Sequence, residues 1–167
     1  MSQEVKIAVE AALKAGKILS ERADDIGKIS FKEFQDPVTE VDHLAEQAII
    51  STIKKSFPDH DFLAEESGDT QGSNSTSKWI IDPLDGTLNY SHGYPCYCVS
   101  IAFEQEGEVK VGVIYNPCLD ELFVAEKGQG AILNGKPIRV STIPTLKKSL
   151  LVTGFAPRVV KSEKDNL

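Results

Sequence analysis

The sequence has few features of a membrane or secreted protein. No apolar run approaches the roughly 20 residues that a membrane-spanning helix needs, and the first residues, Met-Ser-Gln-Glu, lack the pattern of a signal or transit peptide. Only three cysteines occur among 167 residues, an odd number that lacks the pairing of a disulfide-rich secreted domain. We therefore expect free thiols, a cytoplasmic location and no membrane partner.

Positive charge is also scarce. The chain has 18 lysine and arginine residues against 25 aspartate and glutamate residues, which gives a net charge of -7. Proteins that bind nucleic acid use clustered basic residues, so nucleic acid is not expected to be the main ligand. A negatively charged protein can still bind a phosphate ester through metal ions. With 41% hydrophobic and 26% charged residues, the chain has the composition of an ordinary globular domain.

Hydrophobic periodicity predicts two helices followed by a series of strands. Apolar residues at helical spacing predict one helix over residues 3–24 and a second that opens at Thr39 and Asp42 and stops at Pro58. The predicted strands are 61–64, 79–81, 98–103, 109–115, 121–125, a hairpin of 131–133 and 136–140 around Asn134-Gly135, and 149–153. The polar tract 68–77 is expected to be a mobile surface loop. This order predicts an α+β fold, with helices packed on one face of a largely antiparallel sheet.

The most informative stretch is Trp-Ile-Ile-Asp-Pro-Leu-Asp-Gly-Thr-Leu-Asn-Tyr, residues 79–90. Asp82 and Asp85 follow an apolar strand and can converge on one hard cation across the intervening proline, and oxygen ligands suit Mg²⁺ or Mn²⁺. Gly86 and Thr87 stand where a helix could begin, and the free N–H groups of a helix N-terminus favour phosphate. Taken alone, the same letters are also typical of a turn between two structured segments.

Two further acidic clusters precede this stretch. Asp42 lies in the first turn of the second predicted helix, where it can be a helix cap or an ionised catalytic residue that the helix dipole fixes in direction. Glu65 and Glu66 directly follow the predicted strand 61–64, where they can be metal ligands or loop residues. His92 invites a catalytic role, but a metal-activated water needs no histidine base, so we do not assign one.

Together these clusters resemble the inositol monophosphatase family of metal-dependent, lithium-sensitive phosphatases. Residues 79–90 match the family signature almost letter for letter, and the resemblance runs from the first helix to about Val152. It implies that residues 1–156 are the N-terminal domain of the layered α/β/α/β/α sugar-phosphatase fold. We expect residues 157–167 to be a polar tail where a second domain would start. That C-terminal domain carries a further metal-binding aspartate in the family and is absent from this chain.

The resemblance also implies the residues of an active site. The implied metal ligands, for two or three Mg²⁺ ions with Mn²⁺ possible, are the carboxylates of Glu65, Asp82 and Asp85 and the carbonyl of Leu84. Asp42 and Thr87 would orient the attacking water, and Gly86 and Thr87 would hold the substrate phosphate. The implied reaction is hydrolysis of a small phosphate monoester by a homodimer. Inositol monophosphate is the default substrate, and fructose bisphosphate, histidinol phosphate and adenosine bisphosphate are alternatives.

A second hypothesis comes from another functional class. A chain without the second domain could be a catalytically inert form that acts as a regulatory or protein-interaction module. Against this, every ligand position that the first domain supplies is intact, and an inert form has no physical need to keep these residues together. We therefore expect an enzyme.

Overall fold

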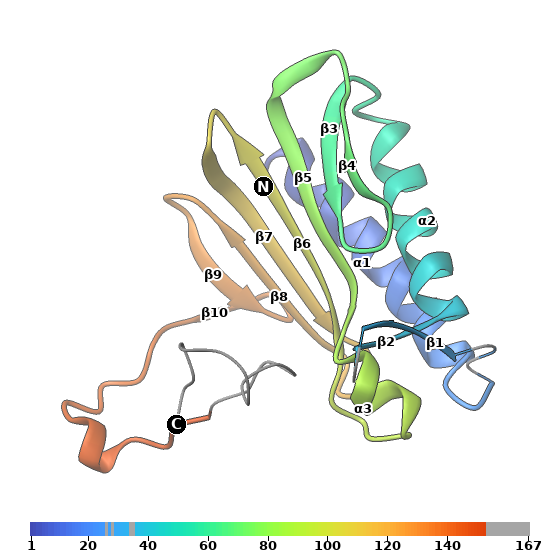
Figure 1. The fold of residues 1–167 in the computed structure, drawn as a ribbon. Helices are drawn as coiled ribbons and strands as arrows, with labels where there is room; N and C mark the ends of the chain where they lie inside the picture. Colours follow the sequence, from blue (N-terminus) through green and yellow to red (C-terminus); the bar gives the residue numbers. More distant parts are fainter. Residues whose placement is uncertain (26, 28, 34–35, 153–167) are drawn as a thin grey trace.

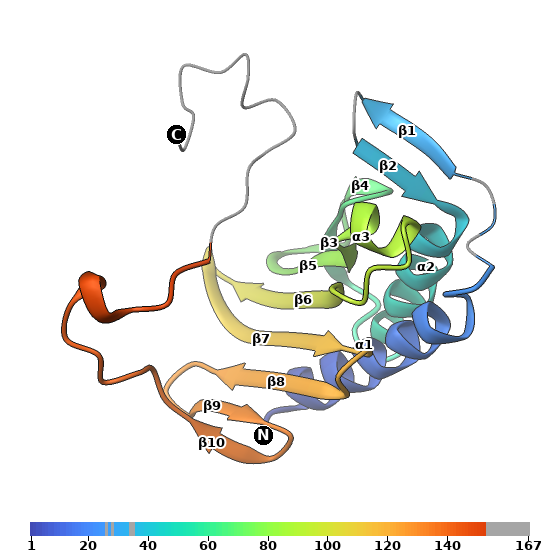
Figure 2. The same ribbon diagram turned by 90° about the horizontal axis from the view of Figure 1, so that it is seen from below.

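Two long helices lie side by side against one face of a curved eight-stranded sheet (Figures 1 and 2). The structure is a computed structural model that describes residues 1–25, 27, 29–33 and 36–152. In chain order the elements are α1 (Gln3–Glu21), β1 (Ile29–Glu33), β2 (Asp36–Thr39), α2 (Glu40–Lys54), β3 (His60–Ala64), β4 (Gly68–Thr70), β5 (Asn74–Asp85), α3 (Thr87–Ser91), β6 (Cys98–Gln105), β7 (Glu108–Asn116), β8 (Glu121–Glu126), β9 (Gly130–Leu133), β10 (Lys136–Ile138) and the 3-10 turn η1 (Leu146–Lys148).

The large sheet has the strand order β10-β9-β8-β7-β6-β5-β3-β4, and β1 pairs with β2 in a separate hairpin. All neighbouring strands are antiparallel except β3 and β5, which are parallel. Short turns connect most of the antiparallel strands, whereas α3 lies in the connection from β5 to β6. Asn134-Gly135 has φ angles of 48° and 78°, the left-handed backbone that a two-residue hairpin turn requires. The predicted α+β fold is therefore confirmed.

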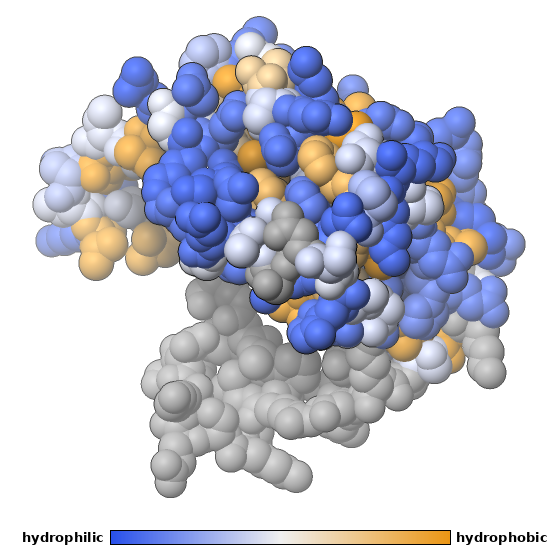
Figure 3. Space-filling view, turned by 90° about the horizontal axis from the view of Figure 1, so that it is seen from above, coloured by the Kyte–Doolittle hydropathy of each residue, from blue (hydrophilic) through white to orange (hydrophobic). Residues whose placement is uncertain are grey.

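Side-chain alternation explains why the helices cover one face of the sheet. Along β6, Val99, Ile101 and Phe103 are buried, whereas the residues between them are partly exposed. α1 packs on β6 and β7, and α2 packs mainly on β5. Among the described residues, no helix covers the opposite face of the sheet (Figure 2). The end of the molecule seen in Figure 3 is mostly hydrophilic. No helix in the described part of the chain is long and apolar enough to cross a membrane.

The predicted loop over residues 68–77 is wrong in part. β4 forms within it and pairs with β3, and β5 begins at Asn74 rather than near residue 79. The backbone N–H of Gly72 donates to the Asp61 carboxylate at 2.6 Å, so the side chain of β3 fixes the connection between the two strands. Local composition missed these strands because their backbone partners come from β3, which lies earlier in the chain.

The predicted strand over residues 149–153 is also wrong where the structure describes it. Residues 149–152 form no strand, and the Val152 side chain is 94% exposed. Apolar, β-branched residues favour a strand only where a neighbouring strand supplies backbone partners, and this segment runs away from the sheet (Figure 1). Thr153 and the predicted tail, 157–167, lie outside the described residues.

Gly16 lets α1 approach β7 closely. A Cβ atom at this position would lie 2.4 Å from two ring atoms of Tyr115. We expect Gly16→Ala to lower the free energy of unfolding by about 1 kcal/mol, because overpacking of about 1–3 kcal/mol exceeds the roughly 1 kcal/mol that alanine gains in helix propensity. Urea denaturation measures the change.

Gly112→Ala is the matched control, because a Cβ at Gly112 on β7 would meet nothing within 4 Å. It should cause no loss of stability. Combining Gly16→Ala with Tyr115→Ala should cost less than the sum of the two single changes. If the stability losses of the two single variants simply add in the double variant, contact with the Tyr115 ring does not cause the loss in Gly16→Ala.

Candidate metal and phosphate site

Parallel pairing of β3 and β5 brings two acidic segments to one edge of the sheet. The register places Ala64, the last residue of β3, opposite Ile81. The backbone N–H of Glu65 donates to the Ile81 carbonyl at 3.1 Å, so Glu65 continues the ladder beside Asp82. β5 then leads directly into α3, which lies at the same end of the sheet (Figure 1).

Pro83 lies in a bulge of β5 and not in the turn that its sequence also allowed. Asp82 pairs with Ser100 and Asp85 pairs with Cys98, so three steps along β5 match two steps along β6. A proline, which has no backbone N–H, is tolerated at such a bulge. On a regular strand, residues three apart point to opposite faces. The extra residue therefore places Asp82 and Asp85 on the same face of the sheet.

Burial and the neighbouring carboxylates Glu65 and Asp85 oppose the ionisation of Asp82. Burial, the charge of Glu65, a hydrogen bond with Glu65 and the charge of Asp85 together raise the pKa of Asp82 to about 7, with burial the largest cause. One contact lowers the pKa of Asp82: the Leu84 N–H donates a hydrogen bond to Asp82 Oδ1 at 3.1 Å. A hard divalent cation would stabilise all three charges, so the chemistry of this donor set fits Mg²⁺.

The side chains do not surround a preformed ion position. Within the described part of the chain, no three His, Cys, Asp or Glu side chains are already arranged to hold a metal. Glu65 and Asp82 instead share a hydrogen bond with each other. The assignment of a metal to these residues therefore rests on their chemistry and proximity.

Asp42 is both a helix cap and a neighbour of Thr87. Its Oδ2 accepts hydrogen bonds from the backbone N–H and the hydroxyl of Thr39, at 2.8 and 2.5 Å, which completes a capping box at the start of α2. Its Oδ1 lies 3.0 Å from Thr87 Oγ1 at the start of α3. Asp42 is only 1% exposed, so these contacts fix its direction. The two roles that the sequence left open are compatible in this geometry.

Gly86 and Leu84 complete the turn from β5 into α3. Gly86 has a φ angle of 99°, and a Cβ there would lie 2.9 Å from the Cys96 carbonyl oxygen, so only glycine fits without strain. Thr87 Oγ1 lies 3.0 Å from the Leu84 carbonyl oxygen. The structure thus places all seven predicted site residues on three neighbouring segments: the start of α2, the residue after β3, and the stretch from the end of β5 to the first residue of α3.

Two reactive side chains near the group take other roles. Burial and the charges of Asp85 and Asp82 raise the pKa of the Cys98 thiol to about 12, so this thiol stays protonated at neutral pH. The His92 ring is exposed and lies against the end of α3, with Nδ1 2.9 Å from the Leu88 carbonyl oxygen.

Sequence reasoning missed Glu46. This glutamate is 4% exposed and contacts the segment that follows Glu65. The available signal was its spacing, because Glu46 lies four residues after Asp42 and next to Ala45, on the apolar stripe of α2. A charged residue on a buried helix face marks a position where packing alone does not explain the side chain.

Comparison with known proteins gives consistent matches. The model of the inositol monophosphatase family matches residues 1–167. Nus factor SuhB of Pasteurella multocida is 44% identical over 158 residues, which cover 93% of this chain and 59% of that protein. Inositol monophosphatase from Anabaena (Nostoc) sp. PCC 7120 superposes with a TM-score of 0.85 at 43% identity, covering 97% of this chain and 59% of the other.

A more distant structure, of an IMPase/NADP phosphatase complexed with Mg²⁺ and phosphate, superposes with a TM-score of 0.67 at 28% identity. It covers 75% of this chain and 48% of the other. The present chain spans about three-fifths of the length of the Pasteurella multocida and Anabaena relatives, 59% in both cases.

The raised pKa of Asp82 predicts how stability depends on pH. The pKa of this group is about 7 in the folded protein against an ordinary value of 3.8, so the folded state binds the proton more tightly than the unfolded state. In the presence of a chelator, stability should fall as pH rises from about 4 to about 7. Asp82→Asn should remove this fall and should make the metal-free protein more stable than wild type at pH 8.

Thermal unfolding at several pH values, with EDTA and with Mg²⁺, tests this prediction. Mg²⁺ should raise the melting temperature of wild type more than that of Asp82→Asn. Asp69→Asn, a change at an exposed position of β4, is the control and should behave as wild type. If Asp82→Asn and wild type show the same pH dependence in EDTA, Asp82 does not carry this linkage.

Proposed function

Because this chain belongs to the inositol monophosphatase family, whose model matches residues 1–167, we propose that it carries the metal-binding part of a Mg²⁺-dependent phosphatase. The proposed reaction is hydrolysis of a small phosphate monoester. The observation that supports it most is the convergence of the Glu65, Asp82 and Asp85 carboxylates next to the hydrogen-bonded pair of Asp42 and Thr87.

The proposed metal ligands are the carboxylates of Glu65, Asp82 and Asp85 and the carbonyl oxygen of Leu84. Their oxygen atoms and mutual repulsion suit two or three Mg²⁺ ions, with Mn²⁺ possible. A relative complexed with Mg²⁺ and phosphate gives independent support for this cofactor. When bound, the ions would neutralise phosphoryl charge and activate water for in-line attack.

Asp42 and Thr87 are suited to hold the attacking water. The Thr87 hydroxyl has one proton, and the anchored Oδ1 of Asp42 lies 3.0 Å away to accept it. The hydroxyl oxygen then keeps lone pairs that can accept a hydrogen bond from water. The backbone N–H groups of Gly86 and Thr87, at the start of α3, would donate to the phosphate oxygens. Such fixed donors stabilise the charge that develops in the transition state.

We propose inositol monophosphate as the substrate, with fructose bisphosphate, histidinol phosphate and adenosine bisphosphate as alternatives. Inositol monophosphatase from Anabaena, at 43% identity, favours the first. Inhibition by lithium, a homodimer and a cytoplasmic location belong to the same proposal. In the family, selectivity among these substrates rests mainly on the second, C-terminal domain.

A regulatory or protein-interaction role is the second candidate. It is favoured by the name of one relative, Nus factor SuhB, which is 44% identical to this chain. The two candidates differ in their need for the carboxylates. An Asp85→Asn protein that loses turnover but keeps a partner interaction would support the second candidate, and a change in both would tie the interaction to the metal site.

Asp85→Asn tests the proposed reaction in the complete enzyme. The change removes a charged ligand and almost no volume, so turnover of inositol monophosphate should fall by several orders of magnitude while the fold persists. His92→Ala is the comparison and should stay within about tenfold of wild type, because removal of a true histidine base costs about 10²–10⁴-fold. Turnover of Asp85→Asn within about tenfold of wild type would exclude Asp85 as a ligand.

The 167-residue chain should bind Mg²⁺ more weakly than a longer form. The resemblance implies that one further carboxylate ligand and part of the cleft come from the C-terminal domain. Mg²⁺ demands near-octahedral oxygen coordination, so loss of one charged ligand weakens binding and orientation together. The comparison is calorimetric Mg²⁺ titration and phosphate release for the chain alone and for a fusion with the C-terminal part of the Pasteurella multocida relative. Equal turnover of the chain alone and of the fusion would show that the active site is not where we propose it.

A further inference from the structure

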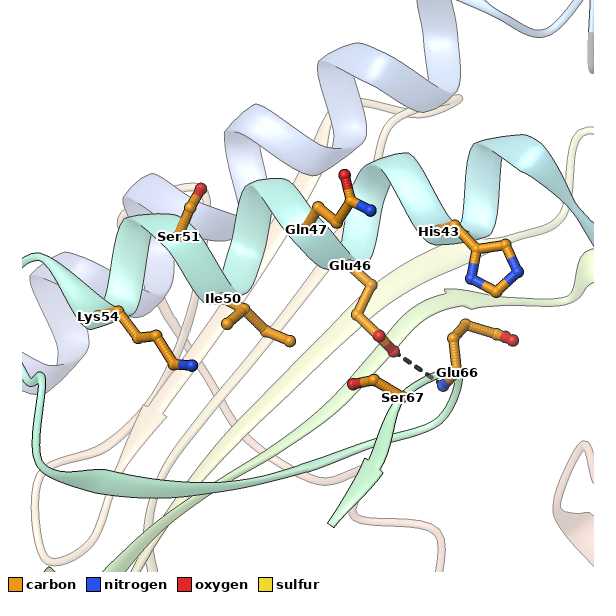
Figure 4. Close-up of a pocket in the computed structure, with 8 residues that line it drawn as sticks. All are labelled: His43, Glu46, Gln47, Ile50, Ser51, Lys54, Glu66 and Ser67. Carbon is orange, nitrogen blue, oxygen red and sulfur yellow. Dashed lines mark hydrogen bonds between the residues drawn. The ribbon is translucent and has the colours of Figure 1, made fainter. Parts of the chain in front are cut away.

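Glu46 joins α2 to the segment that follows β3. Its Oε2 accepts a hydrogen bond from the backbone N–H of Glu66 at 2.8 Å, across 20 residues of sequence (Figure 4). Glu46 is 4% exposed and lies in the wall of a cavity of about 430 Å³ between α2 and this segment. The bond reaches the residue directly after Glu65, the proposed metal ligand.

We infer that Glu46 is a positioning residue for Glu65, an inference that rests on the proposed metal site. The backbone of Glu65 lies between two held peptide groups. Its own N–H donates to the Ile81 carbonyl at 3.1 Å, and the next N–H donates to Glu46. These two peptide planes flank the Glu65 Cα atom, so together they limit its φ and ψ angles. Those angles fix the direction of the Glu65 Cα–Cβ bond, from which the carboxylate extends.

Packing alone does not explain a carboxylate at this position. The buried face of α2 otherwise consists mainly of apolar residues, which pack against the core without loss of hydration. A buried carboxylate loses its water, and one backbone hydrogen bond offsets only part of that loss. An apolar side chain of similar length would therefore suit stability at least as well. What it could not provide is an acceptor for the Glu66 N–H.

The alternative is that Glu46 acts through its negative charge. Glu46 lies on the same face of α2 as Asp42 and near the proposed ligands, so its field would favour any bound cation. Lys54 lines the same cavity, and its positive charge opposes that field (Figure 4). Glutamine separates the two explanations, because its amide oxygen can accept the same hydrogen bond but has no charge.

Loss of the acceptor should weaken metal binding without abolishing the chemistry. Changes to residues that orient metal ligands typically cost about 10–100-fold in metal affinity or activity. We expect Glu46→Ala and Glu46→Met to raise the Mg²⁺ dissociation constant by about 10-fold or more. At saturating Mg²⁺, kcat should stay within about threefold of wild type, because the ligands themselves remain.

The experiment uses the complete native protein. Isothermal calorimetry gives the Mg²⁺ dissociation constant, and phosphate release at varied Mg²⁺ gives the activation constant and kcat. Four variants are compared: Glu46→Ala, Glu46→Met, which keeps the buried volume if alanine impairs folding, Glu46→Gln, which keeps the acceptor, and Gln47→Ala. Gln47 is an exposed residue that lines the same cavity and serves as the matched control.

The expected result is weak Mg²⁺ binding in the alanine and methionine variants and nearly normal binding in the glutamine and Gln47→Ala variants. Equally weak binding in Glu46→Gln would assign the effect to charge and overturn the positioning role. Wild-type Mg²⁺ affinity in both Glu46→Ala and Glu46→Met, with a lowered melting temperature, would make Glu46 a structural residue only. If wild type itself neither binds Mg²⁺ nor releases phosphate, the proposed function fails instead.

Discussion

The parallel pairing of β3 with β5 is the constraint on which the candidate site depends. Antiparallel neighbours reverse direction, so the C-terminal ends of two such strands lie at opposite edges of a sheet. β3 and β5 are the one parallel pair in an otherwise antiparallel sheet, as far as the described residues show. Their carboxyl ends therefore meet, and Glu65 lies beside Asp82. The bulge at Pro83 then adds Asp85 to the same face.

The proximity of these carboxylates would favour metal binding but disfavours the metal-free folded state. Burial and neighbouring carboxylates raise the pKa of Asp82 to about 7, so ionisation of this residue near neutral pH disfavours the folded state without a cation. A divalent ion bound at the proposed site would reverse the sign, because the charges that repel one another would attract the ion. Metal binding and folding become linked through one carboxylate. We interpret this destabilisation of the metal-free protein as a sign that these described residues form a binding site.

Local signals predicted most elements of the fold. The caps at Thr39 and Asp42, the turn at Asn134-Gly135 and the apolar periodicity of α1 each act within a few residues, and the structure confirms all three. The failures share one cause. β4 and the start of β5 lie in a polar tract, for which local composition predicted a loop. Residues 149–152 are mostly apolar but have no strand partner, and there local composition predicted a strand. Strand formation depends on a partner that can lie far away in sequence.

Some features of the candidate site could likewise be predicted from local sequence, and others could not. Its carboxylates lie near the ends of strands or at a helix start, so their chemistry could be predicted from local sequence and from family resemblance. The bulge at Pro83 could not, because the letters Asp-Pro-Leu-Asp-Gly are equally typical of a turn, and pairing with Ser100 and Cys98 decides between the two. Glu46 was missed because its role depends on a bond to a residue 20 positions away.

α2 carries residues that contact both parts of the candidate site, the segment after β5 and the segment after β3. Asp42 and Glu46 lie one turn apart on the same helix face. Asp42 contacts Thr87 after β5, and Glu46 contacts Glu66 after β3. Ile49 and Ile53 continue that face into the hydrophobic core. Any shift of α2 on the sheet would therefore move Asp42, which we propose orients water with Thr87, and the proposed support of Glu65 together. The precision of the proposed metal site thus depends on helix packing, well beyond the residues that would touch an ion.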